Sequence, residues 1–150
     1  MVFLKRFYVS TSAETDLIPI THDIRYALRD AGINEGLASV VVTESGAGIT
    51  LSENLPAVLD ELRRALELFP GEGVHALTRK KEALAVGPRV KAAMLGRMLS
   101  IPFTAKELLI SQHEDVFLID FESTPKRREV VIQIMGDKPA TPPPGPQGGR

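Results

Sequence analysis

The sequence contains no cysteine. This absence excludes disulfides, thiolate zinc sites, iron–sulfur clusters and cysteine nucleophiles, and it leaves the redox compartment undecided. Tryptophan is also absent, asparagine is scarce, and eleven arginines stand against seven lysines. Such a composition favours a thermophilic source.

Long apolar runs are missing as well, since no stretch of the sequence approaches the roughly 18–20 residues that span a bilayer. The first residues, Met1–Arg6, lack the long apolar region of a signal peptide. Neither sign of charge is in excess, because the formal net charge is -1, so the chain as a whole is not attracted to nucleic acid or to an anionic membrane. We therefore expect a cytoplasmic protein with neither nucleic acid nor membrane as a partner.

The remaining composition is ordinary for a globular domain with one core, with 150 residues of which 43% are hydrophobic and 25% charged. Residues 137–150 are rich in proline and glycine, have no apolar periodicity, and cannot bury enough surface to offset their ordering entropy. We predict a domain over residues 1–136 and a solvated tail over residues 137–150. The alternative is a tail that serves as a proline-rich ligand for another domain.

Hydrophobic periodicity predicts helices over residues 22–31, capped by Thr21, and from Pro56 to Phe69. A short third helix is expected over residues 89–99, and the polar stretch 71–87 is expected to be a loop. Strands are predicted over residues 2–10, 36–44, 49–53, 100–104, 108–111, 116–122 and 128–135.

One predicted strand has apolar residues on both sides. Val116 and Leu118 point one way, and Phe117, Ile119 and Phe121 point the other, as a strand covered on both faces requires. The strands outnumber the helices and do not alternate regularly with them. We predict an α+β fold in which antiparallel sheets form a sandwich or a distorted barrel with two or three helices.

The turn signal Ser45–Gly48 lies between the predicted strands 36–44 and 49–53 and predicts a hairpin. Its small residues would let backbone amides approach a phosphate, but neither a Walker lysine nor a dinucleotide fingerprint accompanies it. A plain hairpin turn is therefore favoured. Ser45 also has no assignable Asp–His partner, so the sequence does not support a hydrolase triad.

The histidines His22, His75 and His113 show none of the close spacings that build metal sites, and surface or capping roles are favoured. Arg89 and Lys91 lie at an expected helix start, where amides and basic side chains can together hold an anion. Two solvated charges are the alternative there.

Two basic runs are assigned to solvent rather than to a site. Residues 79–81 have no aromatic platform for nucleic acid beside them. Residues 126–128 lie at the start of the last predicted strand, where charges commonly serve solubility and edge protection.

Several segments match short motifs of one family in collinear order from about Phe7 to Gly136. Residues 16–24 and 31–37 are similar to "ITD … SGI..GL", residues 47–54 to "AAITINEN", residues 90–96, 100–102 and 107–108 to "HLKSSLLG … IPI … G.L", and residues 116–128 to "IFLXEFDGPRXR". The chain thus resembles the YjbQ family, small bacterial and archaeal proteins often labelled secondary thiamine-phosphate synthase. The resemblance implies an α+β fold with antiparallel sheets, a homotrimer, and a histidine-lined pocket with a metal or phosphate ligand. It also implies a weak formation of thiamine phosphate from a hydroxymethylpyrimidine diphosphate and a thiazole phosphate.

The chain departs from the family at the positions that matter for this chemistry. Glu44 stands where the family has the His of "HTTA", and Arg89 where it has the His of "HLKSS". In place of the family's "GTWQ", His113 replaces the tryptophan and Glu114 the glutamine, while His75 matches the His of the "Y.H" loop. A guanidinium has no lone pair and cannot replace a histidine ligand. We therefore expect no metal or other cofactor.

The candidate pocket residues are Glu44, Ser45, His75, Arg89, Lys91, His113 and Glu114. We expect Glu44 and Arg89 to form an ion pair, within one chain or across a subunit interface. Two interpretations of function remain. The first is a divergent family member with an altered pocket and no efficient metal-dependent activity, and the second is a weak thiamine-phosphate synthase-like transferase or a binder of an anionic, phosphorylated small molecule.

The tail prediction can be tested by truncation. Deleting residues 137–150 should leave the melting temperature unchanged within experimental error, because this segment has no apolar face to contribute to a core. Thermal unfolding of the truncated and full-length chains, followed by circular dichroism, measures the difference. A fall of several degrees would mean that the tail is docked on the domain.

Overall fold

The computed structural model describes residues 1–12, 15–69, 71 and 73–137. In this part of the chain the elements are β1 (Val2–Ser10), β2 (Asp16–Pro19), α1 (Thr21–Ala31), β3 (Glu35–Val42), β4 (Ala47–Glu53), α2 (Pro56–Glu67), β5 (His75–Leu77), β6 (Ala83–Ala85), α3 (Val86–Leu95), β7 (Met98–Thr104), β8 (Glu107–Leu108), β9 (Glu114–Asp120) and β10 (Arg127–Asp137). Among the described residues, no helix has both the length and the apolar character needed to cross a bilayer.

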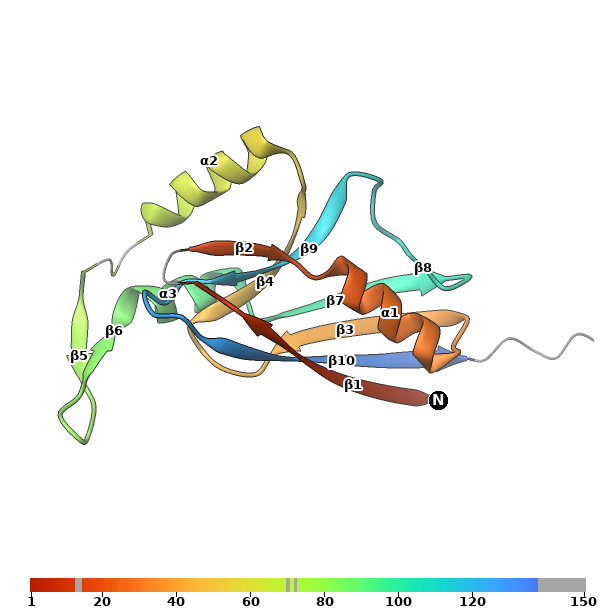
Figure 1. Ribbon diagram of the computed structural model, residues 1–150, viewed down its shortest axis with the longest axis horizontal. Coiled ribbons are helices and arrows are strands. Elements are labelled where there is room, and N and C mark those ends of the chain that lie inside the picture. The colour runs from red at the N-terminus through yellow and green to blue at the C-terminus, as the bar shows by residue number, and fades with distance from the viewer. Residues whose placement is uncertain (13–14, 70, 72, 138–150) are drawn as a thin grey trace, which may run out of the picture.

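The strands form three antiparallel sheets. The order is β1-β10-β3-β7-β8 in the largest sheet, β2-β9-β4 in the second, and β5-β6 in a separate hairpin. The two larger sheets curl into a half-barrel, and the β5–β6 hairpin projects from one end of the molecule (Figure 1). The predicted α+β class with antiparallel sheets is therefore confirmed.

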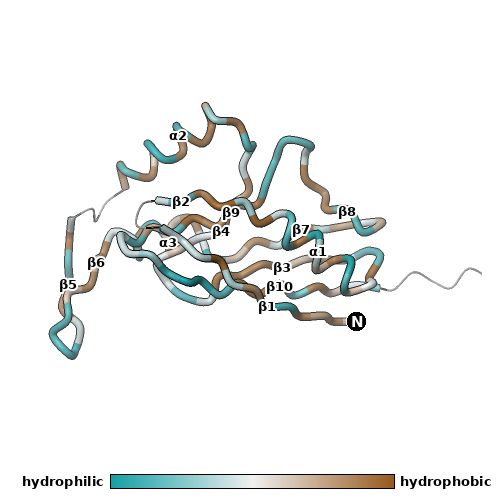
Figure 2. Tube along the Cα trace, in the orientation of Figure 1, coloured by the Kyte–Doolittle hydropathy of each residue, from teal (hydrophilic) through white to brown (hydrophobic). Residues whose placement is uncertain are grey.

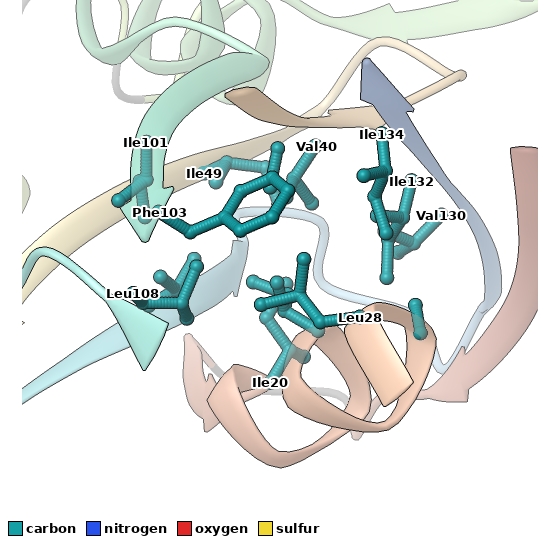
Figure 3. Packing of buried hydrophobic residues seen from close by; sticks show 14 of the residues in the cluster. Ile20, Leu28, Val40, Ile49, Ile101, Phe103, Leu108, Val130, Ile132 and Ile134 are labelled. Carbon is teal, nitrogen blue, oxygen red and sulfur yellow. The ribbon is translucent and has the colours of Figure 1, made fainter. Parts of the chain in front are cut away.

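The main core lies between α1, the inner face of the five-stranded sheet and one face of the second sheet. The buried face of α1 presents Ile24, Ala27, Leu28 and Ala31, which recur at the spacing that places them on one side of a helix. Leu28 points toward aliphatic side chains of the sheet in Figure 3. The predicted helix is confirmed, with Gly32 ending it at φ 65°.

The predicted cap of this helix is wrong in its detail. Thr21 is the first residue of α1 and makes no capping hydrogen bond. Its hydroxyl oxygen instead accepts a hydrogen bond of 2.8 Å from the Val116 N–H. The side chain therefore ties the start of α1 to β9, a tertiary contact that local sequence does not encode.

β9 is covered on both faces, as the alternation of its side chains predicts. Val116 and Leu118 belong to the main core, whereas Phe117, Ile119 and Phe121 pack in a second cluster. The second cluster receives side chains from α2 and α3, of which Leu66 and Ala92 are buried. The strand is thus the partition between two hydrophobic cores.

The predicted hairpin of residues 36–44 and 49–53 is wrong. β3 pairs with β10 and β7, whereas β4 pairs with β9 in the other sheet. The connection at Ser45–Gly46 therefore crosses between sheets. Alternating hydrophobicity identifies a strand but not its partner, and here β10 and β7 pair with β3 while β9 pairs with β4.

The predicted loop over residues 71–87 is also wrong. It contains the β5–β6 hairpin and the first two residues of α3. Figure 2 shows the hydrophilic tip of the hairpin, which made the stretch resemble a loop. α3 begins at Val86 rather than at residue 89, and it ends at Leu95, after which Gly96 adopts φ 94°. This backbone conformation strongly favours glycine and lets the chain turn directly into β7.

Most other predicted strands are present with shifted ends. β2 was not predicted, and the predicted strand 108–111 is reduced to the two-residue β8, Glu107–Leu108. β10 extends through Asp137, whose carbonyl accepts a 3.1 Å hydrogen bond from the Asn34 N–H. A truncation that spares this ladder should therefore begin at residue 138, and the rest of the predicted tail, residues 138–150, lies outside the described residues.

Candidate functional site

A buried ion pair joins the end of β9 to the start of β10. The Arg128 guanidinium donates two hydrogen bonds of 2.9 Å to the Asp120 carboxylate, from Nε to Oδ2 and from Nη2 to Oδ1. Asp120 is 0% and Arg128 1% exposed. Planar pairing of this kind is the strongest form of carboxylate recognition by arginine.

Every acceptor position of the Asp120 carboxylate is used. Besides Arg128, the Thr11 hydroxyl donates to Oδ2 at 2.7 Å and the Glu122 N–H donates to Oδ1 at 3.0 Å. Burial alone raises the pKa of Asp120, but the hydrogen bonds from Arg128, Thr11 and Glu122 and the Arg128 charge outweigh it and lower the pKa. Hydrogen bonding to Asp120 in turn raises the pKa of Arg128 against the opposing effect of burial. Both groups are therefore charged across the ordinary pH range.

The third nitrogen of Arg128 fixes the turn between β3 and β4. Nη1 donates a 3.1 Å hydrogen bond to the Ser45 carbonyl and lies 3.5 Å from Glu44 Oε2. The Glu44 side chain is 64% exposed, so this ion pair is weak. The buried Arg128 guanidinium thus holds the backbone of Ser45 in position.

Glu122 lies between two guanidiniums. Its Oε1 is 3.7 Å from Arg89 Nη1 and 3.8 Å from Arg128 Nη2. The expected pair of Glu44 with Arg89 does not form within one chain, because each group has a different partner: Glu44 contacts Arg128 and Arg89 contacts Glu122. Arg128, which was predicted to face solvent, is the guanidinium that lies near Glu44, at 3.5 Å.

Two cavities meet at Arg89. The first, which we call the turn cavity, has a volume of about 280 Å³ and is lined by Ser45, Arg89, Ala92, Ala93, Gly96 and Arg97. The second, which we call the arm cavity, has a volume of about 350 Å³ and is lined by His75, Ala83, Leu84, Ala85, Arg89, Glu122, Ser123, Thr124 and Lys126. Both cavities have room for a small molecule.

Arg89 is held in the first part of α3 rather than at its start. The helix begins at Val86, three residues before Arg89, and the joint use of helix-start amides and Arg89 to hold an anion stays a prediction. The Arg89 Nη1 donates a 2.9 Å hydrogen bond to the Ala85 carbonyl at the end of β6. Lys91, the neighbouring candidate, is buried, at 6% exposure.

The structure separates the remaining candidates. His75 lines the arm cavity with Arg89, whereas His113 and Glu114 lie at the start of β9, at the opposite end of this strand from Asp120. A seven-residue strand spans about 20 Å. The Ser111 N–H donates a 2.8 Å hydrogen bond to Glu114 Oε1 and lowers the pKa of this carboxyl. Within one chain, His113 and Glu114 therefore do not share a pocket with Arg89.

Sequence reasoning missed Asp120, Glu122, Arg97 and the true place of Arg128. One usable signal was present: Arg128 alternates with Val130 and Ile132 on the inward face of β10, whereas Arg127 is exposed. Among the described residues, no three or more His, Asp or Glu side chains are grouped so as to hold a metal ion. The charged and polar residues that line the two cavities can form ion pairs and hydrogen bonds with a ligand.

Comparison with known proteins gives the chain a family. Residues 5–137 match the family model described as "UPF0047 protein YjbQ-like". The chain belongs to the YjbQ family. One curated relative, UPF0047 protein YugU of Bacillus subtilis, is 29% identical over 135 residues, which are 89% of this chain and 99% of the relative. Another, UPF0047 protein MJ1081 of Methanocaldococcus jannaschii, is 27% identical over 138 residues, 90% of this chain and 96% of the relative.

Solved structures of YjbQ-like proteins have the same fold. A YbjQ-like protein of unknown function from Sulfolobus solfataricus superposes with a TM-score of 0.82 at 20% identity, covering 91% of this chain and 99% of that one. A hypothetical protein from Aeropyrum pernix gives 0.79 at 18% identity, with 90% and 99% covered. The likeness at these identities concerns the fold alone.

The buried pair gives a prediction for stability. Asp120→Asn should lower the free energy of unfolding by roughly 3–5 kcal/mol near neutral pH, because Arg128 would stay buried without its full counter-charge. Glu44→Gln is the matched control: it removes the exposed carboxylate from the same guanidinium and should cost at most about 1 kcal/mol. Urea unfolding of both variants and the wild type measures the two effects.

The same experiment has a pH dependence of known sign. Because folding lowers the pKa of Asp120, the stability from its ionised form is present above the unfolded pKa of about 3.9 and is lost as the pH falls through the lower folded pKa. The gap between wild type and Asp120→Asn should therefore stay constant from about pH 7 to about pH 5 and shrink as the pH falls below about 4. A gap that keeps its full size at lower pH would contradict the role given to the ionised carboxylate.

Proposed function

We propose that this YjbQ-family protein binds a small phosphorylated molecule in the arm cavity and has no efficient metal-dependent activity. The observation that carries the proposal is the composition of the cavity lining. It includes two basic residues, a histidine and two residues with hydroxyl groups: Arg89, Lys126, His75, Ser123 and Thr124. A phosphate monoester carries about −1.5 to −2 charges and three strong acceptor oxygens. Arginine and lysine together with hydroxyl donors suit such a group.

The state of Arg89 supports this proposal. Its side chain is 35% exposed, so the guanidinium is accessible to a ligand, and its bond to the Ala85 carbonyl orients it in advance. A pre-oriented donor loses less entropy when the ligand binds. The same guanidinium argues against a family-type metal site, because it cannot donate a lone pair.

Anion binding gives a direct test. Arg89→Gln should weaken binding of ethyl phosphate at least about tenfold, since a charge-assisted hydrogen bond of roughly 1.5 kcal/mol or more is lost. Isothermal titration calorimetry measures the affinity, and Arg63→Gln on the solvent face of α2, where Arg63 pairs with Asp60, is the matched control. Lys126→Gln should also weaken binding.

Other outcomes of this titration would place the ligand in the other cavity or contradict phosphate binding. A larger effect of Arg97→Gln than of Lys126→Gln would move the ligand to the turn cavity. Wild-type protein that binds no phosphate compound would remove the proposal.

The purified protein should also contain less than stoichiometric zinc by elemental analysis. A full complement of metal would instead support the metal-dependent interpretation.

We also propose that the protein is a homotrimer. The outer face of the five-stranded sheet supports this, because an apolar row crosses four neighbouring strands there: Val2, Met135, Leu37 and Pro102 lie opposite one another in register. Val2 and Met135 are 56% and 51% exposed in the single chain. Among the described elements, no helix covers this face (Figure 1), and contiguous apolar surface of this kind is typical of subunit interfaces.

Light scattering coupled to size exclusion tests the assembly. The expected mass at micromolar concentration is three times that of the 16.3 kDa chain, and Leu37→Lys with Met135→Lys should shift it to a smaller species, because two charges would be buried in the interface. Leu68→Lys, at a residue 82% exposed at the end of α2, is the control. A monomeric wild type would refute the trimer, and an unchanged double variant would exclude this face.

A further inference from the structure

The arm cavity contains a carboxylate that phosphate binding alone does not explain. Glu122 lines the cavity beside Arg89 and Lys126. A carboxylate next to a phosphate repels it, so a site for a bare phosphate gains nothing from Glu122. The position of this side chain therefore needs a separate account.

Glu122 is held in place from three sides. Its N–H donates to Asp120 Oδ1 at 3.0 Å, which fixes the backbone. Gly46, at φ 95°, lies directly against the carboxylate, and a Cβ built there would be 2.5 Å from Oε1. The Arg128 Nη2 atom lies 3.8 Å from Glu122 Oε1. The carboxylate thus occupies a prepared position in the cavity wall.

The acceptor capacity of Glu122 is not consumed by its neighbours. The distances of 3.7 and 3.8 Å from Oε1 to Arg89 and Arg128 are longer than hydrogen bonds. Arg128 already has its two short bonds to Asp120 and does not need Glu122 as its main counter-ion. With its side chain 16% exposed, the Glu122 carboxylate keeps room for a donor that comes from the cavity.

We propose that Glu122 determines specificity by accepting a hydrogen bond from a hydroxyl or ammonium group that the ligand bears close to its phosphate. The inference rests on the proposed function. Arg89 and Lys126 receive the phosphate, and Glu122 receives the donor, so the preferred ligand is a phosphate monoester with a hydroxyl or amino group on the neighbouring carbons. When the ester has no such donor, nothing offsets the repulsion between the Glu122 carboxylate and the phosphate.

Three small probes isolate this effect. Ethyl phosphate, 2-hydroxyethyl phosphate and 2-aminoethyl phosphate differ only in the group at the second carbon. Wild-type protein should bind 2-aminoethyl phosphate at least about tenfold more tightly than ethyl phosphate in calorimetry, the factor that one charge-assisted hydrogen bond supplies, with 2-hydroxyethyl phosphate between the two. Glu122→Gln should reduce this preference to less than about threefold while it leaves ethyl phosphate binding equal or tighter, because the repulsion is gone.

A structural role of Glu122 predicts something else. In that case Glu122→Gln lowers the melting temperature but leaves the ratio of the two affinities unchanged, and the inference is wrong. Glu61→Gln, at an exposed carboxylate of α2 that pairs with Arg64, is the matched control and should alter neither quantity. If Glu122→Gln does not fold, Glu122→Asp keeps the charge but withdraws it by one methylene, and it too should lose the preference.

The outcomes separate this inference from the proposal on which it rests. Binding of all three probes that depends on Arg89 but shows no preference in the wild type overturns the role of Glu122 and leaves the phosphate site intact. Absence of binding of any probe to the wild type overturns both. A preference that survives both Glu122 variants assigns the donor to another acceptor and refutes the inference.

Discussion

The fold depends on one requirement: a charge placed at the end of a strand that is buried on both faces must be neutralised where it lies. β9 runs between two hydrophobic cores, and its last residue is Asp120. An unpaired carboxylate there would be prohibitively costly, and Arg128 meets the requirement with two parallel hydrogen bonds while Thr11 and a backbone amide occupy the other acceptor positions. The start of β10, the end of β1 and the end of β9 are thereby joined at one point.

The candidate site is built outward from this point. Arg128 holds the Ser45 carbonyl, which forms a wall of the turn cavity, and Asp120 holds the backbone of Glu122, which forms a wall of the arm cavity. Arg89 lies where the two cavities meet. The buried pair of Asp120 and Arg128 thus positions the backbone of Glu122 and Ser45, which line the two cavities. Supporting hydrogen bonds of this kind commonly hold the residues of a binding site in a fixed geometry.

The sequence could predict what depends on periodicity. The helix near Leu28 and the two-sided strand around Leu118 follow from spacing alone, and the family resemblance follows from short motifs in order. Spacing does not say which strands pair, so β3 and β4 were joined wrongly in one hairpin. The run of basic residues before β10 was treated as one exposed unit, whereas strand alternation exposes Arg127 and buries Arg128. Partners of a charge are set by the tertiary fold, and for this reason neither the Asp120–Arg128 pair nor the position of Glu122 could be derived beforehand.

The β5–β6 hairpin has a consequence for how the chain tolerates change in length. Its base is continuous with α3: the Val86 N–H bonds to the Val74 carbonyl, and Arg89 bonds to the Ala85 carbonyl. Its tip, with Arg79 and Lys80, is exposed. An insertion at the tip would only lengthen a solvated turn, whereas one residue added between Ala85 and Arg89 would rotate the guanidinium by about 100° around the helix, since each helical residue turns by that amount. Among homologues, length variation in this region should therefore be found at the tip and avoided at the base.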